Sequence, residues 1–452
     1  MASPTDANQR GPWGAPLLSM REGAFFWLSA FYVVYCVRPE DWVPGLSYVP
    51  LAKITGLLAF IALLTSVGRT KRRLRDLPRE GRYLIALICI LIPSSLLSPV
   101  WRGGALVHSL DFAKVSVAVI LTFLLVTTLD RLRRIIFIQA AAVAVIAVVS
   151  MVKGHDVDRL EGVLGGIYSN SNDLAFAIVL SLPFALAFLL RTRSMVRKIM
   201  WLIAMFVMAA ALFKTASRAG FIELVVAGSV CLWHFGIRGK RPQLVAITAV
   251  VAAGLLISMG GPLKRRFFAI SGDVNSSLDQ RAYGSYEERL ALTVESLKGM
   301  ERYPILGIGV HNFPNYSGRW KEVHNAYLQM GVEAGIPALI LYLMFFWCGF
   351  SNLRKLRKRG DLDPETTLFV GALHSSLIGF VVGALFAPEA YQFFPYFAVA
   401  QTSALFAIVM EREPASVPSV RFSRSRIPSP ESAPEVRSGV RSRFRDATLD
   451  RR

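Results

Sequence analysis

Charged residues are scarce in this chain, and acidic residues are scarcer than basic ones. Only 18% of the 452 residues are charged, whereas a typical soluble protein has about 25%. Because this composition is unusual for a soluble protein, an ordinary cytosolic enzyme is not expected. Disorder is excluded for most of the chain, since 53% of the residues are hydrophobic and disordered proteins are poor in apolar residues. The net charge is nevertheless +20, from 51 Lys and Arg against 31 Asp and Glu.

Cysteine is rare as well, with four residues in the whole chain. Cys36, Cys89, Cys231 and Cys348 fall in or beside apolar segments, and none forms a Cys-x-x-Cys pair. A disulfide framework or a cysteine metal site is therefore not indicated, and packing is the preferred interpretation. The first twenty residues lack an apolar core followed by a small-residue cleavage site, so no cleavable signal peptide is expected.

Long apolar runs are what the sequence has in abundance. A run of about 20 apolar residues spans the hydrocarbon core of a membrane as a helix. We therefore predict an all-α integral membrane protein with about twelve transmembrane helices. The expected spans lie near residues 19–37, 48–67, 82–98, 113–129, 133–152, 173–190, 196–213, 219–237, 243–260, 326–349, 366–387 and 394–411.

The basic residues gather in alternate connections between these spans. The basic connections include D-R-L-R-R, R-T-R-S-M-V-R-K, G-I-R-G-K-R and L-R-K-L-R-K-R-G, whereas those between them, such as W-R-G-G and A-P-E-A-Y-Q, are poor in charge. Because Lys and Arg mark cytoplasmic loops, we expect these basic connections and both termini in the cytoplasm. Residues 1–412 then form a polytopic membrane domain.

The segment 413–452 is rich in Ser, Pro and Arg and poor in apolar residues. It is expected to be a disordered, basic cytoplasmic tail that contacts the anionic headgroups of membrane lipids. Nucleic-acid binding is the rival interpretation of the arginines. No nucleic-acid partner is expected, because no folded basic module accompanies the tail.

One expected outer loop, residues 261–325, is too long to be a simple connector. A loop of this length without structure is rare unless it is functional. Leu290, Val294, Leu297 and Met300 recur at helical spacing in it, which predicts an amphipathic helix on or near the outer membrane surface.

Three residues on the expected outer face are candidates for chemistry. His324 lies where the loop meets the tenth expected span and is a candidate general base, with Asn325 beside it. Arg218 and Arg289 suit a phosphorylated substrate, because guanidinium groups bind phosphate oxygens in bidentate fashion. Each residue has an alternative role. A histidine at a membrane interface often only places its polar end in water, and arginines at the ends of spans extend to the headgroups of membrane lipids. Glu333 is an intramembrane carboxylate expected to face away from His324.

Two Asp-x-Asp motifs raise the alternative of a metal-bound phosphate. Asp156 and Asp158 lie on the expected outer side, but a polar loop is the preferred interpretation. Asp361 and Asp363 lie on the expected cytoplasmic side, where they are more typical of a turn and a helix start, with Pro364 near the first helical position.

These residues occur in an order that resembles the O-antigen ligase and polymerase superfamily. The resemblance covers roughly residues 160–350. It is carried by T-A-S-R-A-G, P-I-L-G-I-G-V-H-N-F, H-N-A-Y-L-Q-M-G-V-E-A-G-I-P and G-G-I-Y-S-N-S-N-D-L-A.

That resemblance implies a bacterial inner-membrane enzyme of the GT-C type, with its active site at the periplasmic face. It implies transfer of a glycan from an undecaprenyl diphosphate carrier, metal-independent and inverting, with no cofactor. His324 would be the general base, and Arg218 and Arg289 would contact the diphosphate. The acceptor would be lipid A-core, a glycan or a protein hydroxyl. A repeat-unit polymerase of the same superfamily is the alternative, and a twelve-span transporter or flippase is a further one.

Overall fold

A computed structural model describes residues 20–65, 71–154, 159–162, 168, 170–246 and 277–411 of the chain. The side chains of residues 20–22 and 277–286 are excluded from this description. The expected tail at 413–452, the Asp156/Asp158 motif and almost all of the ninth expected span lie outside the described residues.

The described residues form helices and their connections, and no β-strand occurs among them. The helices α1 to α9 are Met20–Val37, Pro39–Trp42, Leu51–Thr65, Arg79–Leu96, Arg102–Leu125, Leu129–Lys153, Ser171–Arg191, Met195–Lys214 and Arg218–Cys231. A 3-10 turn, η2 (Leu74–Asp76), precedes α4, and a π-helical segment, η3 (Leu232–Ile237), continues α9. The helices α12 to α17 are Ser277–Arg302, Phe313–Ser317, Ala326–Ala334, Ile336–Lys358, Pro364–Gly383 and Phe393–Glu411.

Eight helices within the described ranges are long and apolar enough to cross a membrane. They are α5 to α8, α9 together with η3, and α15 to α17. Helices α1, α3 and α4 lie at the first three expected spans but are not among these eight, and α3 is an apolar helix of 15 residues. The protein is therefore a multi-pass, all-helical membrane protein, with eight candidate spans in the described residues where about twelve were expected in the whole chain.

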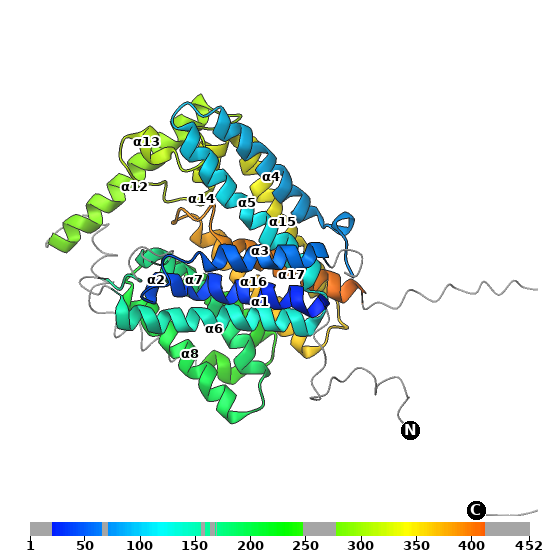
Figure 1. Cartoon of the computed structure of the whole chain (residues 1–452). Coiled ribbons are helices and arrows are strands. Elements are labelled where there is room, and N and C mark those ends of the chain that lie inside the picture. The colour runs from blue at the N-terminus through cyan, green and yellow to red at the C-terminus, as the bar shows by residue number, and fades with distance from the viewer. Residues whose placement is uncertain are drawn as a thin grey trace, which may run out of the picture. The chain divides into compact units, whose positions relative to one another are not determined.

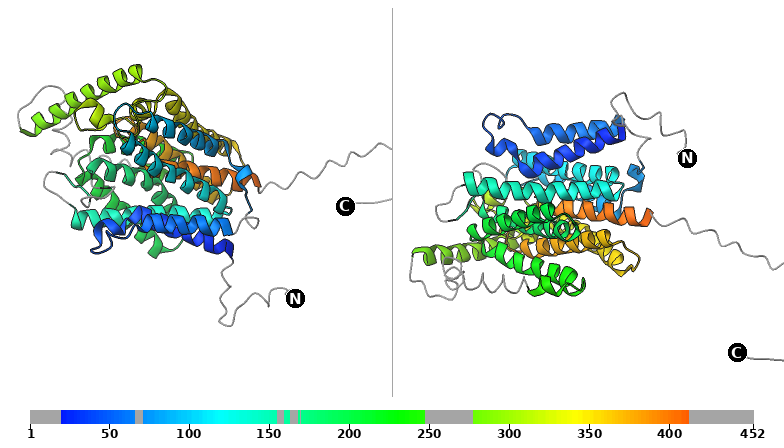
Figure 2. Two further views of the ribbon diagram at one scale, coloured as in Figure 1. Left: turned by 45° about the horizontal axis from the view of Figure 1, so that its top comes forward. Right: turned by 90° about the horizontal axis from the view of Figure 1, so that it is seen from below.

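Helices α7, α9 and α16 pack against one another. Helices α1 and α3 form a layer beside α6, while α15 packs against α4 (Figures 1 and 2). Small residues on α16 allow its close approach to α9: a Cβ on Gly383 would lie 2.8 Å from the carboxyl carbon of Glu223, and one on Gly379 would lie 3.2 Å from Ala227. Such close backbone approach is how helices gain packing energy in a membrane.

The expected span at 326–349 is wrong as one continuous helix, because it breaks at Gly335 into α14 and α15. Gly335 has a φ of +88°, and a Cβ there would lie 2.2 Å from the carbonyl oxygen of Ile305. The break brings the G-I-G turn against the end of α14, where Ile308 N–H donates to Val332 O at 3.0 Å and Gly309 N–H donates to Glu333 O at 2.8 Å. The turn thus satisfies carbonyls that a helix end leaves without partners.

The expected amphipathic helix of the long loop is present as α12. Leu290, Val294 and Leu297 are exposed on it, as an apolar stripe on a membrane surface would be. Met300 differs, because it packs against a small buried cluster on the opposite face of α12. Figure 1 shows α12 and α13 next to α14, and α12 contacts both of them.

Candidate active site

Arg218, Arg289 and His324 come from three separate elements but influence one another electrostatically. Arg218 begins α9, Arg289 lies on α12, and His324 stands two residues before α14. Burial and the charge of Arg218 lower the pKa of Arg289. Burial and the charge of Arg289 lower the pKa of His324 to about 4. The fold therefore brings two guanidinium groups and one imidazole into a single site.

A tight turn between α8 and α9 positions Arg218. Ala216 adopts a φ of +48°, a left-handed conformation that is unfavourable for a residue other than glycine. The hydroxyl of Ser217 caps α9 by accepting from Gly220 N–H at 3.1 Å, and it donates to the side-chain oxygen of Asn172 at 2.8 Å. Arg159 donates to the same Asn172 oxygen at 3.1 Å. This network ties the start of α9 to the start of α7.

A small apolar cluster positions Arg289 and His324 relative to each other. Its five core members are fully buried or nearly so, and they come from α12, the G-I-G turn, α13, the loop before α14 and α14 itself: Leu292, Ile308, Phe313, Val323 and Val332. Val323 directly precedes His324, and Leu292 lies one turn of helix after Arg289. An ion pair of 2.6 Å between Lys321 and Glu288 holds the same loop to α12.

Two polar atoms of this site have no hydrogen-bond partner within the described residues. They are the buried His324 Nδ1 and the buried Arg289 Nε. A buried polar atom without a partner costs free energy, so such atoms in a native protein indicate a ligand or water that pairs with them. Because Arg289 Nε can only donate, an anion is the ligand that suits it.

Asn325 and Glu333 hold the structure around this site. The side-chain oxygen of Asn325 caps α14 by accepting from Tyr327 N–H at 3.0 Å and Leu328 N–H at 3.1 Å. Glu333 is fully buried, and its carboxylate accepts from Phe313 N–H at 3.4 Å. Asn325 therefore orients the backbone next to His324, while Glu333 faces the 311–313 turn.

The site lies inside a segment that matches a known family. Residues 203–343 match the model of a family described as O-antigen ligase. This segment is therefore similar to the O-antigen ligase family. Arg218, Arg289 and His324 all fall within it, as does the G-I-G turn. The match supports the superfamily that the motifs resemble, and it indicates an enzyme of the glycan ligase or polymerase type that acts in a membrane. No curated protein matches the chain.

The matched segment contains a second histidine that the sequence analysis did not single out. His311 Nδ1 lies 3.0 Å from a carboxylate oxygen of Glu322, and the ring centroids of His311 and His108 are 4.5 Å apart. Burial alone would lower the pKa of His311, but the hydrogen bond to Glu322 and the nearby charge of Glu333 outweigh burial and raise it. The H-N-F triplet, one residue after the G-I-G turn, was the signal that could have revealed this histidine.

The environments of the two histidines therefore push their pKa values in opposite directions. His324 is held neutral, which leaves a ring nitrogen able to accept a proton, whereas His311 is held toward its cationic form. A pair of titratable groups with opposed shifts indicates which group serves as base. The opposed shifts favour His324 over His311 as the proton acceptor.

A further carboxylate, Glu389, was also missed by sequence reasoning. It lies in the connection between α16 and α17, outside the matched segment, and it is almost fully buried. Burial and the neighbouring Asp173 raise its pKa well above the usual range, and the charge of Glu322 contributes as well. Glu322 thus influences this carboxylate and both histidines of the matched segment electrostatically.

Among the described residues, no group of three His, Cys, Asp or Glu side chains is arranged to hold a metal ion. The interpretation of the Asp-x-Asp motif at Asp361 and Asp363 as helix-start chemistry is confirmed. Asp363 caps α16 by accepting from Thr366 N–H at 3.0 Å, and Pro364 is the first residue of α16. Asp361 pairs with Arg359 at 3.0 Å.

Proposed function

We propose that this protein transfers a glycan from an undecaprenyl diphosphate carrier to an acceptor hydroxyl at the periplasmic face of the inner membrane. The observation that carries the proposal is the convergence of Arg218, Arg289 and a neutral His324 within a segment similar to the O-antigen ligase family. Arg218 lies at the end of α9 opposite to the basic connection after η3. Because basic connections mark the cytoplasm, the three residues belong to the opposite, periplasmic side.

The two arginines suit the diphosphate of the donor. Negative charge grows on the diphosphate as the bond between the sugar's anomeric carbon and the diphosphate oxygen breaks. Guanidinium groups placed beforehand stabilise this charge, the role that a metal ion serves in other enzymes. A diphosphate is already a weak base, so its departure needs no strong general acid.

The imidazole of His324 suits the acceptor. The hydroxyl oxygen of the acceptor attacks the anomeric carbon from the side opposite the diphosphate, which inverts the configuration. His324 takes the hydroxyl proton, and the electron pair of the broken bond leaves with the diphosphate. The low pKa of His324 keeps the ring neutral near pH 7, so it is ready to accept that proton before the donor binds.

Binding of the donor should strengthen this base. The charge of Arg289 is one cause of the low pKa of His324. An anionic diphosphate bound to the arginines offsets that charge and favours the protonated imidazole, so the pKa of His324 rises toward its usual range. A base with a pKa near the working pH is the more effective one.

This electrostatic coupling predicts a specific pH dependence of transfer. The value of kcat/KM reports the free enzyme, so it should fall on the acid side only near pH 4 to 5. The value of kcat reports the enzyme with donor bound, so it should begin to fall at a higher pH. Replacement R289Q removes a neighbouring positive charge, so it should raise the pKa of His324 and move the acid limb of kcat/KM up by about one pH unit. The measurement is a rate profile from about pH 3.5 to 8 for the wild type and for R289Q, each normalised to its own plateau.

The exposed Lys298 on the same helix provides the control, and K298Q should leave the profile in place. An acid limb of kcat/KM near pH 6.5 in the wild type, unmoved by R289Q, would contradict the coupling of Arg289 to His324.

The direct test is transfer in vitro by the purified full chain with a defined undecaprenyl diphosphate glycan. Lipid A-core, a second lipid-linked glycan and a protein are offered as separate acceptors, so the product distinguishes ligase, polymerase and protein glycosyltransferase. We expect full activity in the presence of EDTA. Complete inhibition by EDTA, reversed by a divalent cation, would instead support a metal-bound phosphate at Asp156 and Asp158. Absence of transfer to every acceptor would contradict the proposal and favour a transporter.

A further inference from the structure

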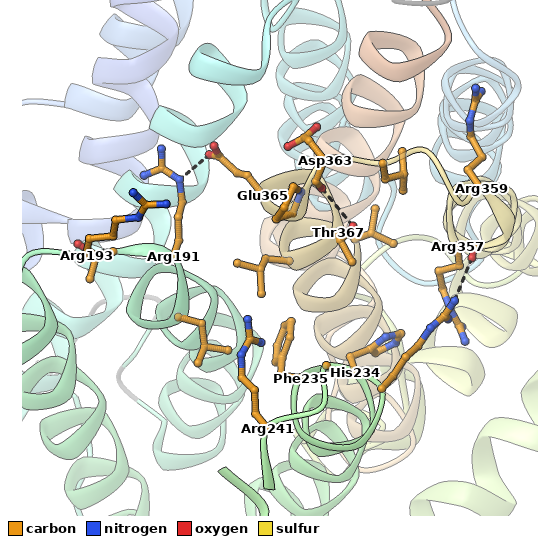
Figure 3. A pocket seen from close by; sticks show the side chains of 18 of the residues that line it. Arg191, Arg193, His234, Phe235, Arg241, Arg357, Arg359, Asp363, Glu365 and Thr367 are labelled. Atoms are coloured by element: carbon orange, nitrogen blue, oxygen red, sulfur yellow. Dashed lines mark hydrogen bonds and ion pairs between the residues drawn. The ribbon is translucent and has the colours of Figure 1, made fainter. Parts of the chain in front are cut away.

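A second site rich in arginine lies at the opposite ends of the helices that build the candidate active site. It is a pocket of about 950 Å³ between the ends of α7, η3, α15 and the start of α16 (Figure 3). His234 in this pocket follows Arg218 by sixteen residues of continuous helix, which separates the two positions by about 24 Å. The pocket is therefore distinct from the transfer site and lies on the side expected to face the cytoplasm.

Most of the positive charge in this pocket is not balanced by carboxylates. Within the described residues, none lies at ion-pair distance from five of the lining cations, which are Arg193, Lys198, Arg238, Arg241 and Arg357. Figure 3 shows Arg193, Arg241 and Arg357 around the same hollow. Arg238 and Arg357 approach each other in this pocket, and like charges at short range repel one another unless an anion binds between them.

The two carboxylates that line the pocket have other partners. Glu365 is shared by Arg191 at 2.9 Å and by Arg133, whose Nη2 lies 2.8 Å from it. Asp363 caps the first turn of α16. Their charges are used in holding α6, α7 and α16 together, so the remaining positive charge is available to a ligand.

A chain of two histidines orients Arg357. His374 Nε2 lies 3.1 Å from Arg357 Nη1, and because arginine can only donate, this nitrogen accepts. His374 Nδ1 then carries the proton and donates to His234 Nε2 at 2.9 Å. Arg238, directly after η3, also approaches Arg357, and its guanidinium donates to the carbonyl oxygen of Arg357 at 3.4 Å.

The guanidinium of Arg357 is thus held in place but can still donate a hydrogen bond, since its buried Nε has no partner among the described residues. The π-helical turn η3 places His234, Phe235 and Arg238 at this point, and π-helical turns occur frequently at functional sites.

Apolar residues line another part of the pocket, directly beside the cations: Leu190, Phe235, Leu362, Leu368 and Val370. A pocket between helix ends with arginines near apolar side chains suits a phosphate group that is attached to an acyl chain. Arginine is also the residue that binds phosphate oxygens in bidentate fashion. We propose that this pocket binds a phosphate group, supplied by the headgroup of an anionic phospholipid or by free phosphate.

The test compares the wild-type full chain with R238Q/R357Q and with R354Q. Arg354 is exposed on α15, one turn before Arg357, and does not line the pocket, so R354Q removes the same kind of charge outside the site. Binding is measured by native mass spectrometry with phosphatidylglycerol or phosphatidylcholine, and by thermal stabilisation with inorganic phosphate. Phosphatidylglycerol should bind R238Q/R357Q about tenfold or more weakly than wild type and R354Q.

Competition between the probes identifies the source of the phosphate. Displacement of phosphatidylglycerol by inorganic phosphate supports free phosphate as the ligand. Phosphatidylglycerol that stays bound in the presence of phosphate supports the lipid headgroup as the ligand. Should R238Q/R357Q fail to fold, R238K/R357K keeps the charge and should fold and bind phosphatidylglycerol at an intermediate level. The proposal is overturned by equal binding of the two lipids to wild type without stabilisation by phosphate, or by a folded R238Q/R357Q that binds as wild type does. None of these outcomes depends on glycan transfer.

Discussion

Replacement of His324 with alanine is expected to bring glycan transfer to background, a loss of about 10²–10⁴-fold, while the protein remains inserted and folded. The loss should appear in kcat, because the side chain is proposed to act on the acceptor proton during the reaction. His324 is half-buried and its Nδ1 has no partner among the described residues, so its removal breaks no side-chain hydrogen bond within them. The measurement is the initial rate with a saturating undecaprenyl diphosphate donor, beside the yield of protein in the membrane fraction.

The matched variant is H311A, which removes the other histidine of the matched segment. His311 is held toward its cationic form by Glu322, so its removal should reduce transfer less than H324A does. Normal transfer by H324A would remove His324 from the mechanism. A larger loss in H311A than in H324A would transfer the role of base to the pair of His311 and Glu322.

Replacement of Arg218 or Arg289 with alanine is expected to reduce kcat/KM for the donor by about 10²–10³-fold each, because one of two guanidinium groups beside the diphosphate is removed. The two losses should be non-additive in the double variant, since both arginines act on one leaving group. Steady-state kinetics with varied donor at fixed acceptor measures the effect.

Lysine at either position should restore only part of the activity, because an ammonium group cannot bind two phosphate oxygens in the planar geometry of arginine. Arg302 is the control, since it is exposed on the same helix as Arg289 and stacks over Tyr303. R302A should transfer at the wild-type rate. Donor kinetics that are unchanged in R218A and R289A would exclude these arginines from diphosphate binding.

The long apolar runs predicted most of the helices, because burial in a membrane demands length and apolarity that can be read directly from the chain. The expected spans at residues 133–152, 173–190 and 394–411 correspond to α6, α7 and α17. The expectation failed at Gly335, where hydropathy continues but the backbone turns. The hydrogen bonds from the G-I-G turn to the end of α14 stabilise that break, and they join residues 24 positions apart, beyond the reach of a local pattern.

The residues of the candidate site could be selected from the sequence, but their relationships could not. The motifs around Arg218, Arg289 and His324 singled them out, and the match at residues 203–343 supports the family that these motifs resemble. The pairing of His311 with Glu322 and the buried Glu389 had no comparable pattern. A pKa depends on burial and on neighbouring charges, and both are set by contacts between distant segments.

The sequence by itself determined that the chain is a helical membrane protein, and its basic connections predict which ends of the helices face the cytoplasm. Both properties follow from composition along a local stretch of chain. The tertiary structure decided which charges meet, since it brings α9, α12 and the loop before α14 to one end of the bundle. At the other end it gathers arginines from α15 and from the segments after α7, η3 and α15 into one pocket. Electrostatic interactions depend on distance in space, and only the packing of helices fixes that distance.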